Sequence, residues 1–454
     1  MDMKKKAVLL FGLWIAVAGP AVLAAQELPE TLTLTLEDAI ELALLQNPHY
    51  LATREREGQA RGIVREAVSR FLPSLNLQGT NTLDEKLFVL EFPSFVPGEP
   101  AQRISIDFTK NYQMALAFSV PLFAGGRLVA GYKQAEYNLR STQEGIRLSE
   151  QETIFDVKRA FYGYLLAREF FAVAEESLKL AEEFHKNVKN LYDVGMSTKF
   201  DLLRSEVQVA NLKPQLIRAK NGRDVGELSL KTVLGIDLGK PIAVVAEGLL
   251  ASTPLDPDVE KGVEEALLRR PELQQIDHQR RMAGEALKIA RGAILPTLAI
   301  GGAYNSWADS LSFRKGAWQN YYSINLSLSV PLFNGFESRA RIGQTKAALR
   351  EIDWIRKGLA DAVAFEVRQA ILNYQQSRES LLSQEKNVEQ AQEAVRIAEL
   401  NFAEGLATAL DVLTTQVALS QARTNYSQGL YDCVMSEAQL EKALGRSRPE
   451  SRSN

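Results

Sequence analysis

The sequence contains one unit written twice, and this internal repeat restricts the fold more than any other feature. Residues 38–48 return 223 positions later, and so do residues 67–73. Residues 119–125 return 210 positions later, at 329–335, with a single change in seven residues. We therefore expect two similar halves, the first over 25–235 and the second over 259–445.

The two offsets differ by 13 residues, and the extra residues must lie between Pro73 and Pro121. That interval contains the segment 92–100, which is too rich in proline for regular structure, so we interpret it as an enlarged loop of the first copy. After Pro121 the offset stays constant. Equal lengths indicate that both copies span the same distance side by side.

Each copy contains a segment in which apolar and small or polar residues alternate, as in an amphipathic β-strand. We predict strands near 111–121 and 321–331, with partner strands near 74–82 and 297–305. A length of about nine residues suits a tilted membrane strand, although a half-buried strand of a soluble sheet has the same pattern. The residues predicted to face lipid are Tyr112, Met114, Leu116, Phe118, Tyr322, Ile324, Leu326 and Leu328.

Four strands cannot close on themselves, and an open sheet edge in hydrocarbon leaves backbone groups unpaired. Membrane strands therefore require several chains, and the smallest known barrels have about eight strands. Two, three or four chains satisfy this requirement.

Long segments without proline predict long helices in both copies. No proline occurs between Pro121 and Pro214, or between Pro331 and Pro449. We predict helical hairpins over 126–235 and 336–445, with Pro214 kinking or restarting the return helix. A helix of that size reaches roughly 100 Å, which suits a compartment-crossing tube or a periplasmic coiled-coil scaffold.

The first 24 residues have three lysines, an apolar run and small residues at the end, as in a secretory signal peptide. A membrane anchor is the alternative, but the apolar run is shorter than the ~20 residues of a spanning helix. Residues 236–258 are predicted to be an irregular connection between the copies, and 446–454 a polar tail.

The remaining composition argues against several classes of function. Cys433 is the only cysteine, and the three histidines have no second ligand at metal-binding spacing. A net charge of −3 gives no basic surface for nucleic acid. No catalytic constellation or phosphate-binding loop is found. We therefore expect no enzyme, no cofactor and no bound metal.

The two hairpins turn through similar segments, each a glycine followed by Thr-x-x-Asp. Glycine suits the end of one helix, and Thr-x-x-Asp caps the start of the next. Capping explains both motifs, but aspartates gathered around an axis would also favour cations in a pore. The residues concerned are Gly195, Thr198, Asp201, Gly405, Thr408 and Asp411.

With these motifs, residues 34–445 resemble the TolC-like outer-membrane efflux protein (outer membrane factor) family. The resemblance implies an α+β membrane protein and a homotrimer. Four strands per chain would contribute to a shared 12-stranded barrel, continued by an antiparallel coiled-coil helical barrel. It places the strands in outer-membrane lipid and the helices in the periplasm.

The resemblance also implies a passive duct of a tripartite export system, docked to a periplasmic adaptor (membrane fusion) protein and an inner-membrane pump. Small-molecule efflux is the leading use and type I protein secretion the alternative. Asp201 and Asp411 match aspartates near the family's periplasmic aperture, and the tip turns with Gly195, Thr198, Gly405 and Thr408 are candidate adaptor contacts. Phe402, Ala407 and Thr414 stand where the best-known member has a tyrosine, an arginine and a second aspartate, so its gating ion pairs are not carried over.

Overall fold

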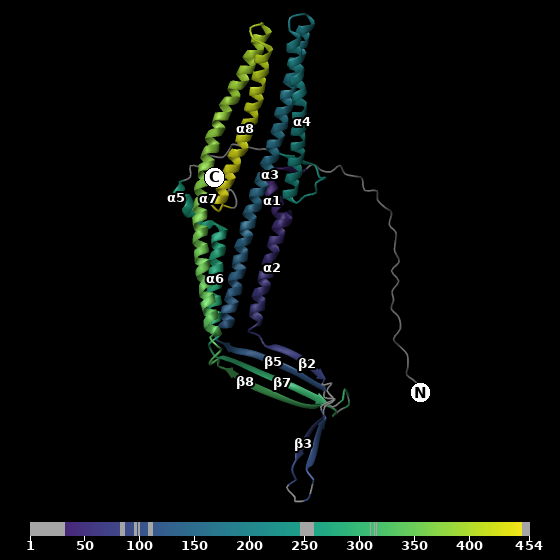
Figure 1. The fold of residues 1–454 in the computed structure, drawn as a ribbon, viewed down its shortest axis with the longest axis vertical. Helices are drawn as coiled ribbons and strands as arrows, with labels where there is room; N and C mark the ends of the chain where they lie inside the picture. The colour runs from purple at the N-terminus through teal and green to yellow at the C-terminus, as the bar shows by residue number, and fades with distance from the viewer. Residues whose placement is uncertain are drawn as a thin grey trace, which may run out of the picture.

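The computed structural model describes residues 32–81, 87–94, 98, 100–107, 112–245, 258–308, 310–312, 314 and 316–446. The predicted signal peptide and nearly all of the polar tail lie outside the described residues. The helical part, a four-stranded sheet and a small hairpin follow one another along the long axis of the molecule (Figure 1).

The helices of the two copies match in order and length. Those of the first copy are α1 (Leu36–Gln46), α2 (Pro48–Ser69), α3 (Arg127–Asp193) and α4 (Lys199–Leu234). Those of the second are α5 (Val259–Arg269), α6 (Pro271–Gly292), α7 (Glu337–Ala403) and α8 (Ala409–Ala443). α3 and α7 both have 67 residues, which corresponds to about 100 Å. None of the described helices combines the length and the apolar character that a membrane-spanning helix needs.

Each long helix packs against two shorter helices of its own copy, and α3 also packs on α6 and α8 of the second copy. α3 packs on α4 along the half that ends at the tip and on α2 along the other half, and α7 packs on α8 and α6 in the same way (Figure 1). The sequence predicted one hairpin per copy and missed α1, α2, α5 and α6, which complete the helical part. α4 continues through Pro214 as one helix, so the predicted restart at this proline is wrong.

The main sheet has the order β2 (Ser74–Asn81), β5 (Tyr112–Ala124), β7 (Thr297–Ala308) and β8 (Gln319–Ser329), and all its neighbours are antiparallel. The prediction of four amphipathic strands, paired within each copy, is confirmed. The β5–β7 pairing joins the two copies in one sheet. β2 and β8 form its open edges within this chain.

The extra residues of the first copy form more than a loop. β3 (Leu87–Phe92) and β4 (Gln102–Asp107) make an antiparallel hairpin that projects beyond the main sheet (Figure 1). The described residues between Phe92 and Gln102 lie outside any strand, as predicted for the proline-rich segment 92–100, and Phe92 is the last residue of β3. The two strands that flank this loop were not predicted.

A second small sheet joins the start of the first copy to the connection. β1 (Leu32–Leu34) and β6 (Ile242–Val244) pair in parallel. The prediction that 236–258 is irregular is wrong at β6, and residues 246–257 lie outside the description. Three residues are too few to show an alternating pattern, which is why the strand was missed.

Two equivalent core clusters lie where the return helices end. Leu230 and Leu234 of α4 pack with α1 and α3, and Leu440 and Leu444 of the second copy pack with α5 and α7. These leucines are almost completely buried in both copies. The repeat in sequence therefore corresponds to a repeat in packing.

Candidate functional site

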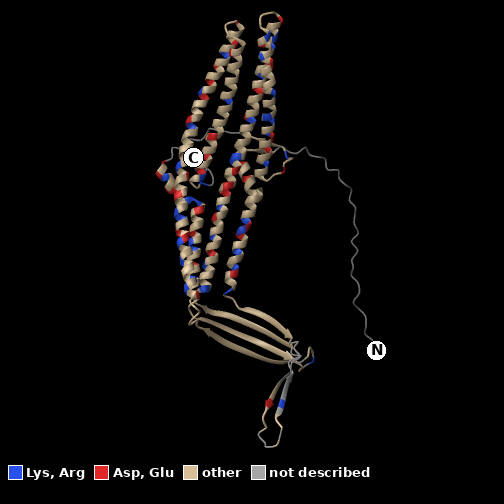
Figure 2. Cartoon of the chain, viewed as in Figure 1, with Lys and Arg blue, Asp and Glu red and all other residues tan. Residues whose placement is uncertain are grey.

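The main sheet carries one uncharged, apolar face. None of its four strands contains a charged residue, in contrast with the helices (Figure 2). The register places Leu116 between Leu77 and Tyr304, and Tyr304 beside Tyr322, so the apolar positions of all strands share a face. All eight residues predicted to face lipid lie on it: Tyr112, Met114, Leu116, Phe118, Tyr322, Ile324, Leu326 and Leu328.

In the described part of the chain, much of this face is exposed. Tyr322 is 80% and Leu326 is 65% exposed. The opposite face of the same strand presents small polar residues such as Ser323, Asn325 and Ser327. A contiguous exposed apolar face of this kind indicates contact with lipid or protein. The open edges β2 and β8 in addition need partner strands, because unpaired backbone groups cost several kcal/mol each in hydrocarbon.

Glycines end the long helices at the two tips, as predicted. Gly195 and Gly405 have φ of +78° and +75°, a backbone conformation that side chains disfavour. The amide of Met196 donates to the carbonyl of Leu191 at 2.8 Å and closes the end of α3. The corresponding bond in the second copy closes α7 at 2.7 Å.

Thr198 and Thr408 cap the helices that follow, and the two aspartates are their partners. The hydroxyl of Thr198 accepts from the amide of Asp201 at 3.1 Å, and that of Thr408 accepts from Asp411 at 3.3 Å. Only Asp411 completes the reciprocal box, since its carboxylate also accepts from the amide of Thr408 at 2.8 Å. The side-chain and backbone hydrogen bonds from Thr408 lower the pKa of Asp411. The predicted capping box is confirmed at Thr408 and Asp411, whereas only the threonine cap forms at Thr198 and Asp201.

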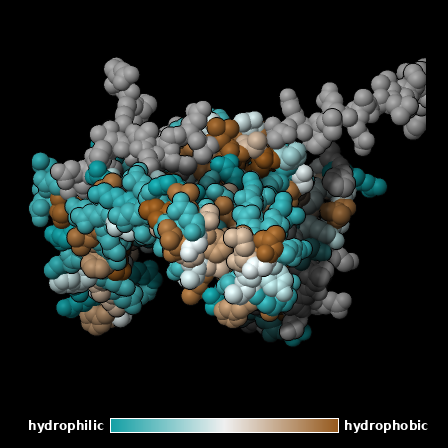
Figure 3. Space-filling view, turned by 90° about the horizontal axis from the view of Figure 1, so that it is seen from above, coloured by the Kyte–Doolittle hydropathy of each residue, from teal (hydrophilic) through white to brown (hydrophobic). Residues whose placement is uncertain are grey.

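Both aspartates lie at the end of the molecule that is far from the sheet, but on separate tips (Figure 1). Viewed from this end, the surface mixes hydrophobic and hydrophilic side chains (Figure 3). Met196, Phe200 and Leu406 are exposed large hydrophobic residues of these turns. Whether the aspartates line an aperture remains a prediction.

Between the tips lies a group of apolar side chains that we call the tip cluster. Its residues come from α3, α4, α7 and α8: Phe184, Val188, Leu202, Ala398, Phe402, Ala409, Val412 and Leu413. The rings of Phe184 and Phe402 are 5.2 Å apart between centroids. The sequence singled out Phe402 as a departure from the family, but it gave no sign of its partner.

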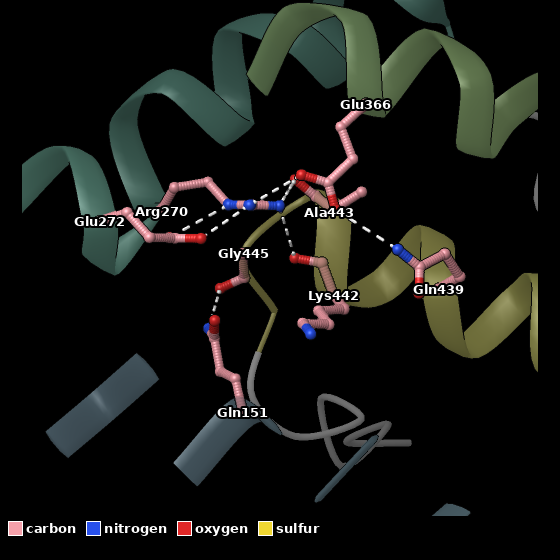
Figure 4. Close-up of polar contacts among 8 residues, drawn as sticks. All are labelled: Gln151, Arg270, Glu272, Glu366, Gln439, Lys442, Ala443 and Gly445. Atoms are coloured by element: carbon pink, nitrogen blue, oxygen red, sulfur yellow. Dashed lines mark hydrogen bonds and ion pairs between the residues drawn. The ribbon is translucent and has the colours of Figure 1, made fainter. Parts of the chain in front are cut away.

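A buried polar network, which we call the Arg270 network, fixes the end of α8 (Figure 4). The side chain of Arg270 is 7% exposed and forms ion pairs with Glu272 at 2.7 Å and Glu366 at 2.9 Å. It also donates to the carbonyls of Lys442 and Ala443 at 3.4 and 3.3 Å. These carbonyls belong to the last turn of a helix, where cations are favoured.

In the first copy, a side-chain amide binds the carboxyl end of the return helix α4. Asn47 precedes α2 as Arg270 precedes α6, and it donates to the carbonyl of Val233 at 2.8 Å. Val233 is the repeat partner of Ala443. The sequence shows Asn-Pro in one copy and Arg-Pro in the other, but it does not show that both residues bind the end of a distant helix.

An amphipathic sheet with one exposed apolar face, joined to helical hairpins of about 100 Å, is typical of outer-membrane channel subunits. The sequence profile described as "Outer membrane efflux protein" matches residues 39–236 and 262–446. The chain therefore belongs to the outer membrane efflux protein family, as the sequence predicted.

Known relatives agree with this assignment. The chain is similar to the pyoverdine export outer membrane protein OpmQ of Pseudomonas putida, at 27% identity over 420 residues, which cover 90% of this chain and 85% of OpmQ. It is similar to the alkaline protease secretion protein AprF of Pseudomonas aeruginosa, at 26% over 339 residues, 73% of this chain and 69% of AprF.

Solved structures show the same fold. The outer membrane channel CmeC of Campylobacter jejuni superposes with a TM-score of 0.76 at 16% identity, covering 92% of this chain and 87% of CmeC. The protein is an outer-membrane duct protein of efflux or secretion, with its helical part in the periplasm.

Proposed function

We propose that three copies of this chain form one passive duct across the outer membrane and that this duct exports small molecules. The exposed, uncharged apolar face of the main sheet, with both edges open, carries the proposal. Lipid would cover the face, and neighbouring copies would pair with the edges. The barrel would then have 12 strands, four from each copy.

The direction of the strands fits this closure. Because β2 and β8 are separated by two antiparallel neighbours, they run in opposite directions. β8 of one copy can therefore pair with β2 of the next in the same antiparallel pattern. The helices point to the same assembly, since Trp354, Phe365 and Leu372 of α7 are exposed and would be covered by the adjacent copy.

The proposal assigns transport without catalysis to this chain. A periplasmic adaptor and an inner-membrane pump would supply the cargo and the energy. The tip turns, with Gly195, Thr198, Gly405 and Thr408, are the proposed adaptor contacts because they are the most distant part from the sheet (Figure 1). Asp201 and Asp411, which begin the return helices there, would line the periplasmic aperture.

Small molecules are the proposed cargo because OpmQ, named for pyoverdine export, aligns with 90% of this chain. Protein secretion is the second candidate, since AprF is named for alkaline protease secretion and aligns with 73%. A deletion strain should distinguish them. Loss of the chain should sensitise cells to small toxic compounds and leave secreted protein unchanged, and the opposite result would favour the second candidate.

The assembly and the aperture can be tested on the purified protein. Native mass spectrometry in detergent should give three chains, and planar bilayers should show cation-selective channels. The double variant Asp201→Asn and Asp411→Asn should weaken the cation preference, because it removes the carboxylates from the aperture. A monomer without conductance would contradict the duct, whereas unchanged selectivity would leave the aspartates as helix caps only.

A further inference from the structure

The tips of the two hairpins contact each other through apolar side chains. Val188 of α3 and Val412 of α8 are completely buried in the tip cluster, and Phe184 is nearly so. Phe402 of α7 packs its ring on Phe184 in a tilted arrangement. Such aromatic pairs contribute beyond the area that they bury.

Polar links between the hairpins stop short of this cluster. The hydroxyl of Ser177 donates to that of Ser420 at 2.9 Å, and Arg423 forms an ion pair with Glu176. In the described part of the chain, these are the polar links between the hairpins that lie nearest to the tips. Beyond them, the described contacts that join the hairpins are those of the tip cluster.

The tip cluster lies next in sequence to the aspartates of the proposed aperture. Leu202 follows Asp201, and Val412 follows Asp411, so each aspartate sits on a helical turn that the cluster holds. A movement that separates the hairpins must expose the rings of Phe184 and Phe402 to water. It would also carry the two aspartates apart.

We propose that the tip cluster is an apolar latch that keeps the aperture closed by holding the α7–α8 hairpin of each chain against its own α3–α4 hairpin. This inference rests on the proposed function, because it needs an aperture at the tips. The latch works without an ion pair. Its strength should therefore change little with ionic strength, whereas exposed ion pairs weaken as salt screens their charges.

Conductance of the full-length protein in planar bilayers tests the latch. Phe184→Ala and Phe402→Ala should each raise the open probability roughly tenfold, because the pair loses its aromatic contact and its buried area. The double variant should exceed the single variants only slightly, since both changes remove one contact. The matched control is Leu400→Ala on α7, two residues before Phe402 and outside the tip turns, where the side chain is 52% exposed, and it should change nothing.

Two further measurements keep the test decisive if an alanine variant fails to assemble. Phe402→Leu keeps the apolar bulk and should open the channel less than the alanine variant would. For the wild type, the open probability should be the same in 0.1 M and 1 M potassium chloride, to within about twofold.

The outcomes separate the latch from the duct. A wild-type protein that forms no channel would overturn the proposed function. A conducting wild type whose open probability is unchanged by Phe184→Ala, Phe402→Ala and Phe402→Leu would overturn the latch alone. So would a strong rise with salt, or an equal rise in Leu400→Ala.

Discussion

Replacing Arg270 with methionine tests whether the Arg270 network fixes the end of α8. Methionine keeps the length and the apolar stem of the side chain but removes the guanidinium. Glu272 and Glu366 would then face each other and the carbonyls of Lys442 and Ala443 without a cation between them. We expect the junction of α5, α6, α7 and α8 to open more readily.

The size of the effect follows from the burial of the three side chains. Removing one partner of a buried ion pair costs roughly 3–5 kcal/mol, because the remaining charge stays uncompensated. Here Glu272 and Glu366 are 20% and 34% exposed, so water compensates part of the lost contact. We therefore expect the lower value, about 3 kcal/mol, which corresponds to roughly 150-fold in an opening equilibrium.

Hydrogen exchange read by mass spectrometry on the assembled protein measures this opening locally. Amides of 438–446 should exchange roughly 150-fold faster in Arg270→Met, while those of 228–236 in the first copy should not change. The internal repeat supplies the matched variant, Asn47→Ala. It loses a helix cap and one hydrogen bond, about 1–2 kcal/mol, and should accelerate 228–236 by roughly 5- to 30-fold.

The faster exchange in Arg270→Met should come from the two carboxylates that are left without a cation. Adding Glu366→Gln to Arg270→Met should restore part of the protection, because it removes one of the two uncompensated carboxylates. If Arg270→Met accelerates exchange by less than about threefold, or accelerates both copies equally, the network does not hold α8 in the way described.

Three further predictions concern the sheet, the joint between sheet and helices, and the tip. Leu326→Arg on the apolar face should weaken membrane assembly by about 2–4 kcal/mol, and Ser327→Arg on the other face should be tolerated, as measured by the yield of folded oligomer. Gly125→Ala should lower the free energy of unfolding by about 3 kcal/mol, because Gly125 has a positive φ and an added Cβ would collide with the carbonyl oxygen of Gly292. The matched change at its repeat partner, Gly335→Ala, should cost only about 1 kcal/mol, because that position also has a positive φ but open space around it. Since its folded pKa is lowered, Asp411 should stabilise the start of α8 above about pH 4 and lose this effect as the pH falls through the folded pKa. Relative to the intrinsic exchange rate at each pH, exchange in 409–413 should therefore rise in acid, and Asp411→Asn should remove that relative rise.

The repeat made much of the fold predictable. α5 and α6 begin 223 residues after α1 and α2, and α7 and α8 begin 210 residues after α3 and α4, the two offsets read from the sequence. At the tips, the 210-residue offset holds because the turn residues recur, glycine for a positive φ and threonine with aspartate for a cap. Helix caps of this kind depend on residues only a few positions apart, so they can be recognised in the sequence.

Contacts between distant segments were less predictable. The β3–β4 hairpin has a proline-rich centre that hides its short strands. Arg270 and Asn47 bind carbonyls more than 170 residues away, and nothing near them in sequence marks the acceptor. Phe184 has no special spacing within α3, so its contact with Phe402 depends on how two hairpins lie together.

The tip cluster also shows why the two copies have diverged. In a closed ring, contacts between the two hairpins of one chain would alternate with contacts between hairpins of neighbouring chains. In the contact between chains, α7 would take the position that α3 has within a chain, and α3 of the neighbour would take the position of α7. The repeat partners of Phe184 and Phe402 are Ala394 and Tyr192. The contact between chains would therefore join an alanine and a tyrosine, which bury less apolar area than two phenylalanines. An assembly of three chains would have the latch only at the contacts between the two hairpins of one chain. The closed aperture would therefore be stabilised mainly by contacts within each chain.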